Sequence, residues 1–134
     1  MTGVGDRALA VVVKIDRIEP WLDDALLDLT TLCDLGTELA VTGNRAGYLG
    51  SRRLRFPVRF LFHQVSDWEF DDPEGIRAML VDDLRFEPEL GGIVLTGPLP
   101  GRLYVRTPCR QITVQTSATP LRTPSWRCVT PRHF

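Results

Sequence analysis

The sequence predicts an α+β fold of the ferredoxin-like, split β-α-β type, followed by a C-terminal hairpin extension and an extended Pro-rich arm. Three observations lead to this fold class. In some stretches apolar and polar residues alternate with a period of two. In two other stretches apolar residues recur every three or four positions. The last segment shows neither period. The 134 residues suffice for one domain. We expect the domain at 1–116 and the arm at 117–134.

Strands are expected where β-branched and apolar residues alternate. The first is ALAVVVKIDRI, residues 8–18, whose apolar face consists of Leu9, Val11, Val13 and Ile15. Shorter strands are expected at residues 37–42, 91–97, 102–107 and 111–116. The turn PLPG joins two of these strands in a hairpin.

Two helices are expected from a period of three to four. In residues 20–36 the apolar stripe consists of Leu22, Ala25, Leu26, Leu29, Leu32 and Cys33. Pro20 suits the first helical turn and Gly36 suits the C-terminal stop. In residues 71–84 the stripe consists of Ile76, Met79, Leu80 and Leu84. Asp71 or Asp72 is the expected N-terminal cap there.

The stretch RRLRFPVRFLF, residues 52–62, predicts a strand with two unlike faces. Its aromatic residues face one way and are expected in the core. Its arginines face the other way and form a basic sheet face, which consists of Arg53, Arg55 and Arg59. Pro57 has no N–H group, so an edge strand or a bulge is expected at this point.

The segment SATPLRTPSWRCVTPRHF, residues 117–134, predicts an extended arm because its three Thr-Pro pairs favour extended backbone. Such a segment buries little on its own, so we expect a protein surface to hold it. The residues expected to make this contact are Leu121, Arg122, Trp126, Arg127, Val129, Arg132 and Phe134.

Charge is distributed unevenly along the chain. All 17 acidic residues lie at or before Glu89, whereas residues 90–134 contain six arginines and no acid. Such asymmetry indicates an anionic partner, or contact between the basic end and the acidic part of the same or another copy. The arginines are spread out rather than clustered, which favours an arm laid along a protein surface.

No motif specifies chemistry. Asp67, Glu69 and Asp71 have the spacing of a calcium loop, but the required Gly and Glu are absent at its later positions. The two histidines and three scattered cysteines form no metal motif, and a Cys–His nucleophile pair has no support in the spacing. We therefore expect no metal and no cofactor. The odd number of cysteines indicates a reduced chain, either cytoplasmic or in a virion.

The hypothesis we favour is a non-enzymatic assembly or interaction subunit of a multi-copy complex, such as a phage virion. Its basic C-terminal arm would bind other protein subunits, of the same or another kind. One alternative is a nucleic-acid-binding module that uses the basic sheet face and the arm. A second alternative is a small enzyme with a pocket between the sheet and its extension. No apolar run has the roughly 20 residues of a membrane span, so no membrane partner is expected.

Overall fold

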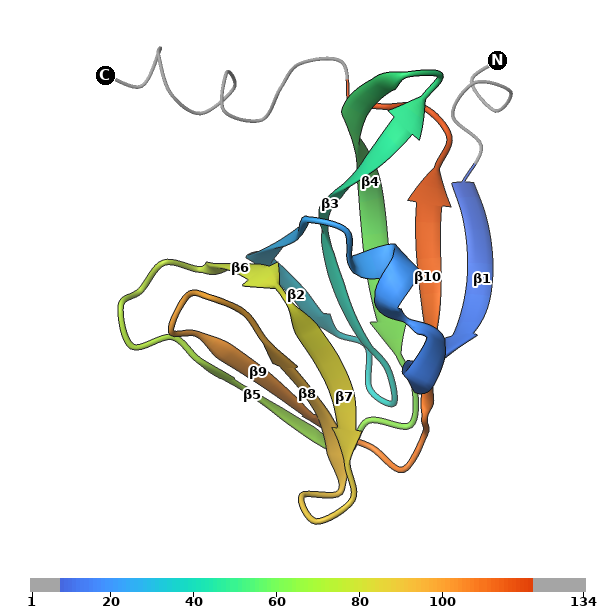
Figure 1. Ribbon diagram of the computed structural model, residues 1–134. Coiled ribbons are helices and arrows are strands. Elements are labelled where there is room, and N and C mark those ends of the chain that lie inside the picture. Colours follow the sequence, from blue (N-terminus) through green and yellow to red (C-terminus); the bar gives the residue numbers. More distant parts are fainter. Residues whose placement is uncertain (1–7, 122–134) are drawn as a thin grey trace.

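The computed structural model describes residues 8–121, and nearly all of its secondary structure is antiparallel β-strand (Figure 1). The ten strands are β1 (Ala8–Lys14), β2 (Ala25–Asp34), β3 (Leu39–Leu49), β4 (Arg52–Phe62), β5 (Asp67–Asp71), β6 (Ala78–Val81), β7 (Asp83–Glu87), β8 (Gly92–Thr96), β9 (Arg102–Arg106) and β10 (Gln111–Ser117). Two short 3-10 helices follow β1, namely η1 (Ile15–Arg17) and η2 (Glu19–Leu22).

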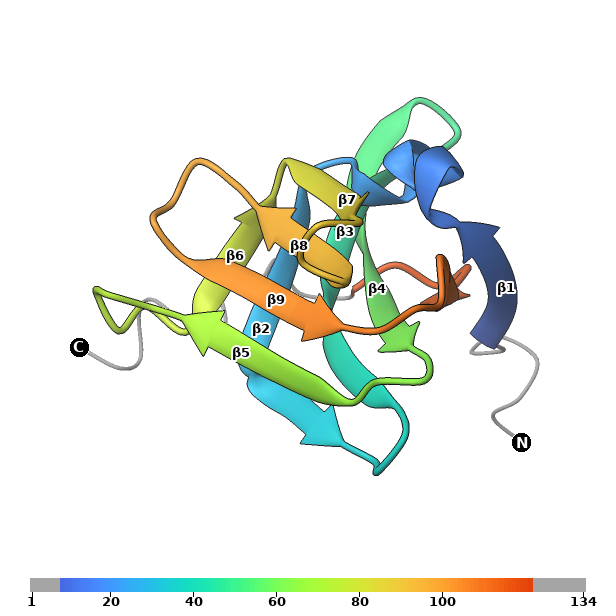
Figure 2. The same cartoon turned by 90° about the horizontal axis from the view of Figure 1, so that it is seen from below.

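The strands form two sheets that pack face to face. Sheet A has the order β1-β10-β4-β3-β2-β6, and sheet B has the order β5-β9-β8-β7. Sheet B lies across β2 and β3 in Figure 2, and β1 lies at the far side of sheet A, away from sheet B, in both views (Figures 1 and 2). The largest fully buried side chains come from both sheets and include Phe60, Phe62, Leu27, Leu39, Met79, Ile93, Leu95, Leu103 and Ile112.

The predicted α+β, ferredoxin-like fold is wrong, because both expected helices are absent. Residues 20–36 contain η2 and then strand β2, in which Ala25, Leu27 and Leu29 are buried alternately. A helix and a strand both place Ala25 and Leu29 on one face, so the local pattern fitted either. Pairing of β2 with β3 and β6 selects the strand.

The second expected helix, at residues 71–84, is a turn followed by β6 and the start of β7. Asp72 does cap backbone N–H groups, since its carboxylate accepts bonds from Ile76 and Arg77. The segment nevertheless leaves helical backbone, because Gly75 and Arg77 have φ angles of 64° and 62°. Asp72 thus closes a turn where the sequence predicted a helix cap.

The strands expected around residues 8–18, 37–42, 52–62, 91–97, 102–107 and 111–116 are all present as β1, β3, β4, β8, β9 and β10. β1 ends at Lys14, earlier than expected, because η1 begins at the next residue. The PLPG turn joins β8 and β9 as predicted.

The edge position or bulge predicted from Pro57 is wrong. β4 lies inside sheet A, and its pairing with β3 runs without a shift of register. The ladder between β10 and β4 ends at the Thr116–Val58 pair, next to Pro57. The missing backbone N–H of Pro57 therefore costs sheet A no hydrogen bond, because the ladder with β10 has already ended there.

The corner between β6 and β7 joins the two sheets. The N–H of Asp82 donates to the carbonyl of Thr96, at the end of β8, over 2.9 Å. Gly97 follows Thr96 and lies so close to β6 that a Cβ atom there would be 1.7 Å from the carbonyl oxygen of Leu80. Glycine is therefore required at this contact between the sheets.

We expect Gly97→Ala to lower the free energy of unfolding by about 2–3 kcal/mol, because the added methyl group meets rigid backbone. Denaturant unfolding followed by circular dichroism measures the loss. Gly101→Ala is the matched control, since its Cβ would have no neighbour nearer than 3.4 Å. Equal stability of the two variants would contradict the close contact at Gly97.

Candidate functional site

The basic sheet face lies on the outer side of β4. Phe56, Phe60 and Phe62 are buried, as the alternation predicted, and Arg53, Arg55 and Arg59 are exposed or half-buried. Strand β4 therefore places the aromatic side chains in the core and the arginines on the surface.

Each arginine of the basic sheet face has a partner within the chain. Arg53 forms ion pairs with Asp24 at 2.8 Å and Asp23 at 3.4 Å. Arg55 donates to the side chain of Asn44 at 2.7 Å and to the carbonyl of Asp24 at 2.6 Å. The arginines thus tie the turn before β2 to β4.

Arg59 donates to the side-chain oxygen of Gln115, on the neighbouring strand β10, over 3.0 Å. A phosphate group arriving at the basic sheet face would compete with this amide, and at Arg53 it would also meet two carboxylates. The arginines of the basic sheet face therefore take part in hydrogen bonds and ion pairs within the chain, although they lie on its surface.

A chain of hydrogen bonds joins three side chains on sheet A. His63 Nδ1 lies 2.8 Å from a carboxylate oxygen of Glu38, and its Nε2 lies 2.7 Å from the hydroxyl of Thr113. The order hydroxyl, imidazole, carboxylate is that of a nucleophile, a base and an orienting acid. The sequence did not reveal this arrangement, because the residues are 25 and 50 positions apart.

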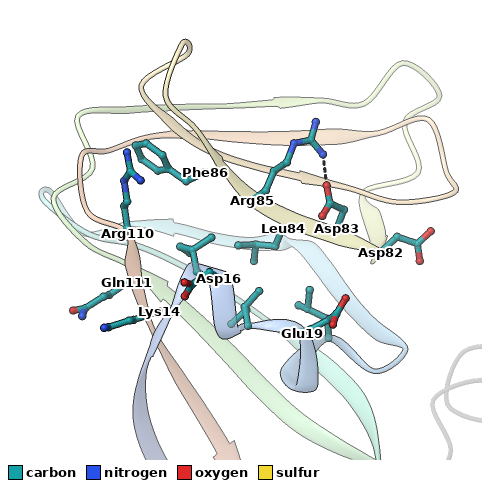
Figure 3. A pocket seen from close by; sticks show the side chains of 13 residues that line it. Lys14, Asp16, Glu19, Asp82, Asp83, Leu84, Arg85, Phe86, Arg110 and Gln111 are labelled. Carbon is teal, nitrogen blue, oxygen red and sulfur yellow. Dashed lines mark hydrogen bonds and ion pairs between the residues drawn. The ribbon is translucent and has the colours of Figure 1, made fainter.

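A pocket with a volume of about 620 Å³ lies between β7 and the η1–η2 segment (Figure 3). Its apolar lining consists of Ile15, Ile18, Leu22, Leu84 and Phe86. Its charged lining consists of Lys14, Asp16, Glu19, Asp82, Asp83, Arg85 and Arg110.

Two of the pocket's cations are held in place. Arg85 pairs with Asp83 and Glu87, and the guanidinium of Arg110 lies 4.2 Å from the ring centre of Phe86. None of the thirteen described residues that line the pocket is Ser, Thr, Cys or His. The Glu38–His63–Thr113 chain lies outside the pocket, so nucleophile, base and cavity do not coincide there.

Three of the four edge strands carry features that prevent pairing with another chain. β6 has only four residues. β5 presents Asp67, Glu69 and Asp71, all exposed. β7 has a charged residue at every second position, Asp83, Arg85 and Glu87.

The fourth edge strand, β1, carries none of these features. It has seven residues, contains no proline, and has its only charge at its last position, Lys14. It pairs with β10 along its whole length without a bulge. Leu9 and Val12 are 51% and 62% exposed, so this edge is apolar and no segment within residues 8–121 covers it.

The backbone groups of β1 that face outward follow from its pairing. The N–H of Ile15 donates to the carbonyl of Arg110, and partners in an antiparallel ladder alternate. The odd-numbered residues of β1 therefore bond to β10. The N–H and C=O groups of Ala8, Ala10, Val12 and Lys14 point to the free edge.

Of the predicted arm, only residues 117–121 belong to the described part of the chain. The N–H of Leu121 donates to the carbonyl of Arg55 over 2.8 Å, so the arm begins beside β4. The other residues predicted for the arm contact lie outside the described residues, namely Arg122, Trp126, Arg127, Val129, Arg132 and Phe134.

Residues 8–121 contain neither a metal-binding cluster of side chains nor a membrane-spanning helix. No three His, Cys, Asp or Glu side chains gather there as a metal site would require. No helix in that range has the length and apolar character to cross a membrane.

The sequence interpretation missed β1 as a candidate interface, although the uncharged run ALAVVV was a usable signal. It also missed the pocket, whose residues come from three separate segments and share no spacing. Comparison of the chain with models of protein families, with curated proteins and with solved structures finds no match in any of the three.

We expect the carboxyl group of Asp24 to titrate below its ordinary value of about 4. The hydrogen bond from Arg53 lowers the pKa of Asp24, and the charge of Arg55 adds a smaller effect. The stabilisation from this pair is present above the unfolded-state pKa and is lost as pH falls through the folded-state pKa.

Carboxyl-carbon NMR of the protein and of two variants tests this titration. Arg53→Gln should raise the pKa of Asp24 more than Arg55→Gln does, because Arg53 supplies both the hydrogen bond and the nearer charge. A pKa that is unchanged in Arg53→Gln would contradict the role of this ion pair.

Proposed function

We propose that the protein is a non-enzymatic assembly or interaction subunit that joins other protein subunits by strand addition at the free edge of β1. The observation that carries this proposal is the contrast among the four edge strands, of which β1 is the longest, is apolar, and has its one charge at its last residue. In strand addition the main-chain hydrogen bonds supply affinity and the flanking side chains supply specificity. A multi-copy complex, such as a virion, is the setting that this proposal fits.

The surroundings of the other candidate features support a protein partner over the two alternatives. Arg53, Arg55 and Arg59 donate to groups of the chain itself, which weakens the case for nucleic-acid binding at the basic sheet face. The Glu38–His63–Thr113 chain and the pocket are separate, which weakens the case for an enzyme.

The C-terminal arm is a second contact in this proposal. Residues 1–121 carry 13 basic and 17 acidic side chains, a formal charge of −4, and residues 122–134 add three arginines. An arm of charge +3 can lie along the acidic body of a neighbouring subunit, where charge would fix its orientation and apolar residues its affinity.

We expect Val12→Pro to weaken association with other subunits by a factor on the order of 10 or more, because a hydrogen bond is lost and the ring obstructs the partner. The Val12 N–H points to the free edge, so the ladder with β10 is retained. Val12→Thr is the matched control, since it keeps both the backbone donor and the branched shape.

Light scattering of the protein purified with its natural neighbours measures this association, and circular dichroism checks the fold. Unchanged association of a folded Val12→Pro variant would rule out strand addition at β1. Loss in Val12→Thr as well would mean that the side chain, rather than the backbone edge, makes the contact.

We expect a chain that ends at Leu121 to lose part of its association while keeping its melting temperature. The truncation removes the three arm arginines but retains all of β10 and the bond from Leu121 to Arg55. Mass in solution and thermal unfolding are the two measurements. An unchanged mass of the complex would show that the arm is not part of the interface.

A further inference from the structure

The outward backbone groups of β1 are complementary to those of a second, antiparallel β1. If two copies meet about a two-fold axis at Val11, Ala10 lies opposite Val12 and Ala8 lies opposite Lys14. These are the four residues whose N–H and C=O groups face the free edge. This one register therefore satisfies every outward backbone group of β1 in both copies.

The side chains of β1 suit the same register. On the face shared with the core, Leu9 would lie opposite Val13 and Val11 opposite its own copy, which buries Leu9 and Val11, now 51% and 39% exposed. On the other face Val12, 62% exposed, would lie beside Ala10. All of these cross-strand pairs are apolar, which is a favourable arrangement in a sheet.

Charge selects the antiparallel direction. The only charged residue of β1 is Lys14. In the antiparallel pair the two Lys14 side chains lie at opposite ends of the ladder, roughly 20 Å apart. A parallel pair in register would place them side by side, where like charges repel.

Pairing about a two-fold axis also removes the unprotected edge. The joined sheet would end at β6 of each copy, and β6 is a four-residue strand that offers little template for further pairing. A closed dimer is therefore the expected product, rather than an open fibre.

We infer that the partner at the β1 edge is a second copy of this chain, paired antiparallel through β1 with Val11 at the two-fold axis. This inference rests on the proposed function and deepens it, since it names the partner and the register.

Light scattering of the isolated full chain over a range of concentrations is the first test. The expected mass is twice 15.1 kDa. A mass of 15.1 kDa at every concentration overturns self-pairing. If Val12→Pro nevertheless breaks a complex with a different subunit, the proposed function stands without it.

The same measurement on a chain that ends at Leu121 tests whether residues 122–134, rather than a second copy, occupy the β1 edge. A full chain that is monomeric and a truncated chain that dimerises would show that residues 122–134 occupy the edge of their own molecule. That result would also overturn the inference. Dimers of both chains support it.

A charge exchange at Val11 tests the two-fold axis without removing any backbone donor. Val11→Glu alone and Val11→Lys alone each place like charges opposite each other, so each should dimerise at least tenfold more weakly than the unchanged chain. Mixing the two variants should restore a dimer that contains one copy of each. Failure of the mixture to associate would overturn the register.

Disulfide formation gives an independent measure of the register. In a chain whose three cysteines are replaced by serine, Val11→Cys should form an intermolecular disulfide, because the two Cα atoms of a non-hydrogen-bonded pair are about 4.5 Å apart, which a disulfide can span. Val12→Cys is the control and should form far less. Cross-linking that is stronger in Val12→Cys would contradict pairing centred on Val11.

Discussion

The backbone pairing of β10 on both of its sides holds sheet A together. One side bonds to β1 along seven residue pairs, and the other bonds to β4 along five. The side chains of Ile112 and Val114 are fully buried in the core. Without β10 the first strand would have no partner, and sheet A would end at β4, with Phe60 and Phe62 at its margin.

The sequence predicted the strands whose alternation was complete. In β4 burial alternates from Arg55 to Phe62, and no helix places Phe56, Phe60 and Phe62 on one side with Arg55 and Arg59 on the other. The failure at β2 has a physical cause, since Ala25 and Leu29 satisfy both periods and only the buried Leu27 separates them. Pairing with residues far away decided that segment, and local sequence carries no record of it.

Parts of the candidate site depended on topology in the same way. The composition revealed an apolar first strand, but it could not show that this strand is an edge. The partners of Arg53 are 29 and 30 positions away, so the basic sheet face seemed free in the sequence while the fold brings Asp23 and Asp24 to it. The net charge of a sequence segment therefore differs from the net charge of the surface on which it lies, because the fold adds residues from other segments.

The distance in sequence between β1 and β10 affects how the protein is made. Val11 pairs with Val114, so during translation the first strand leaves the ribosome about a hundred residues before its partner. Until β10 has been made, the run ALAVVV lacks the strand with which it pairs in the native sheet, and exposed apolar strands of this kind favour aggregation. The pairing of β10 with both β1 and β4 can therefore form only once the C-terminal third of the chain has been made.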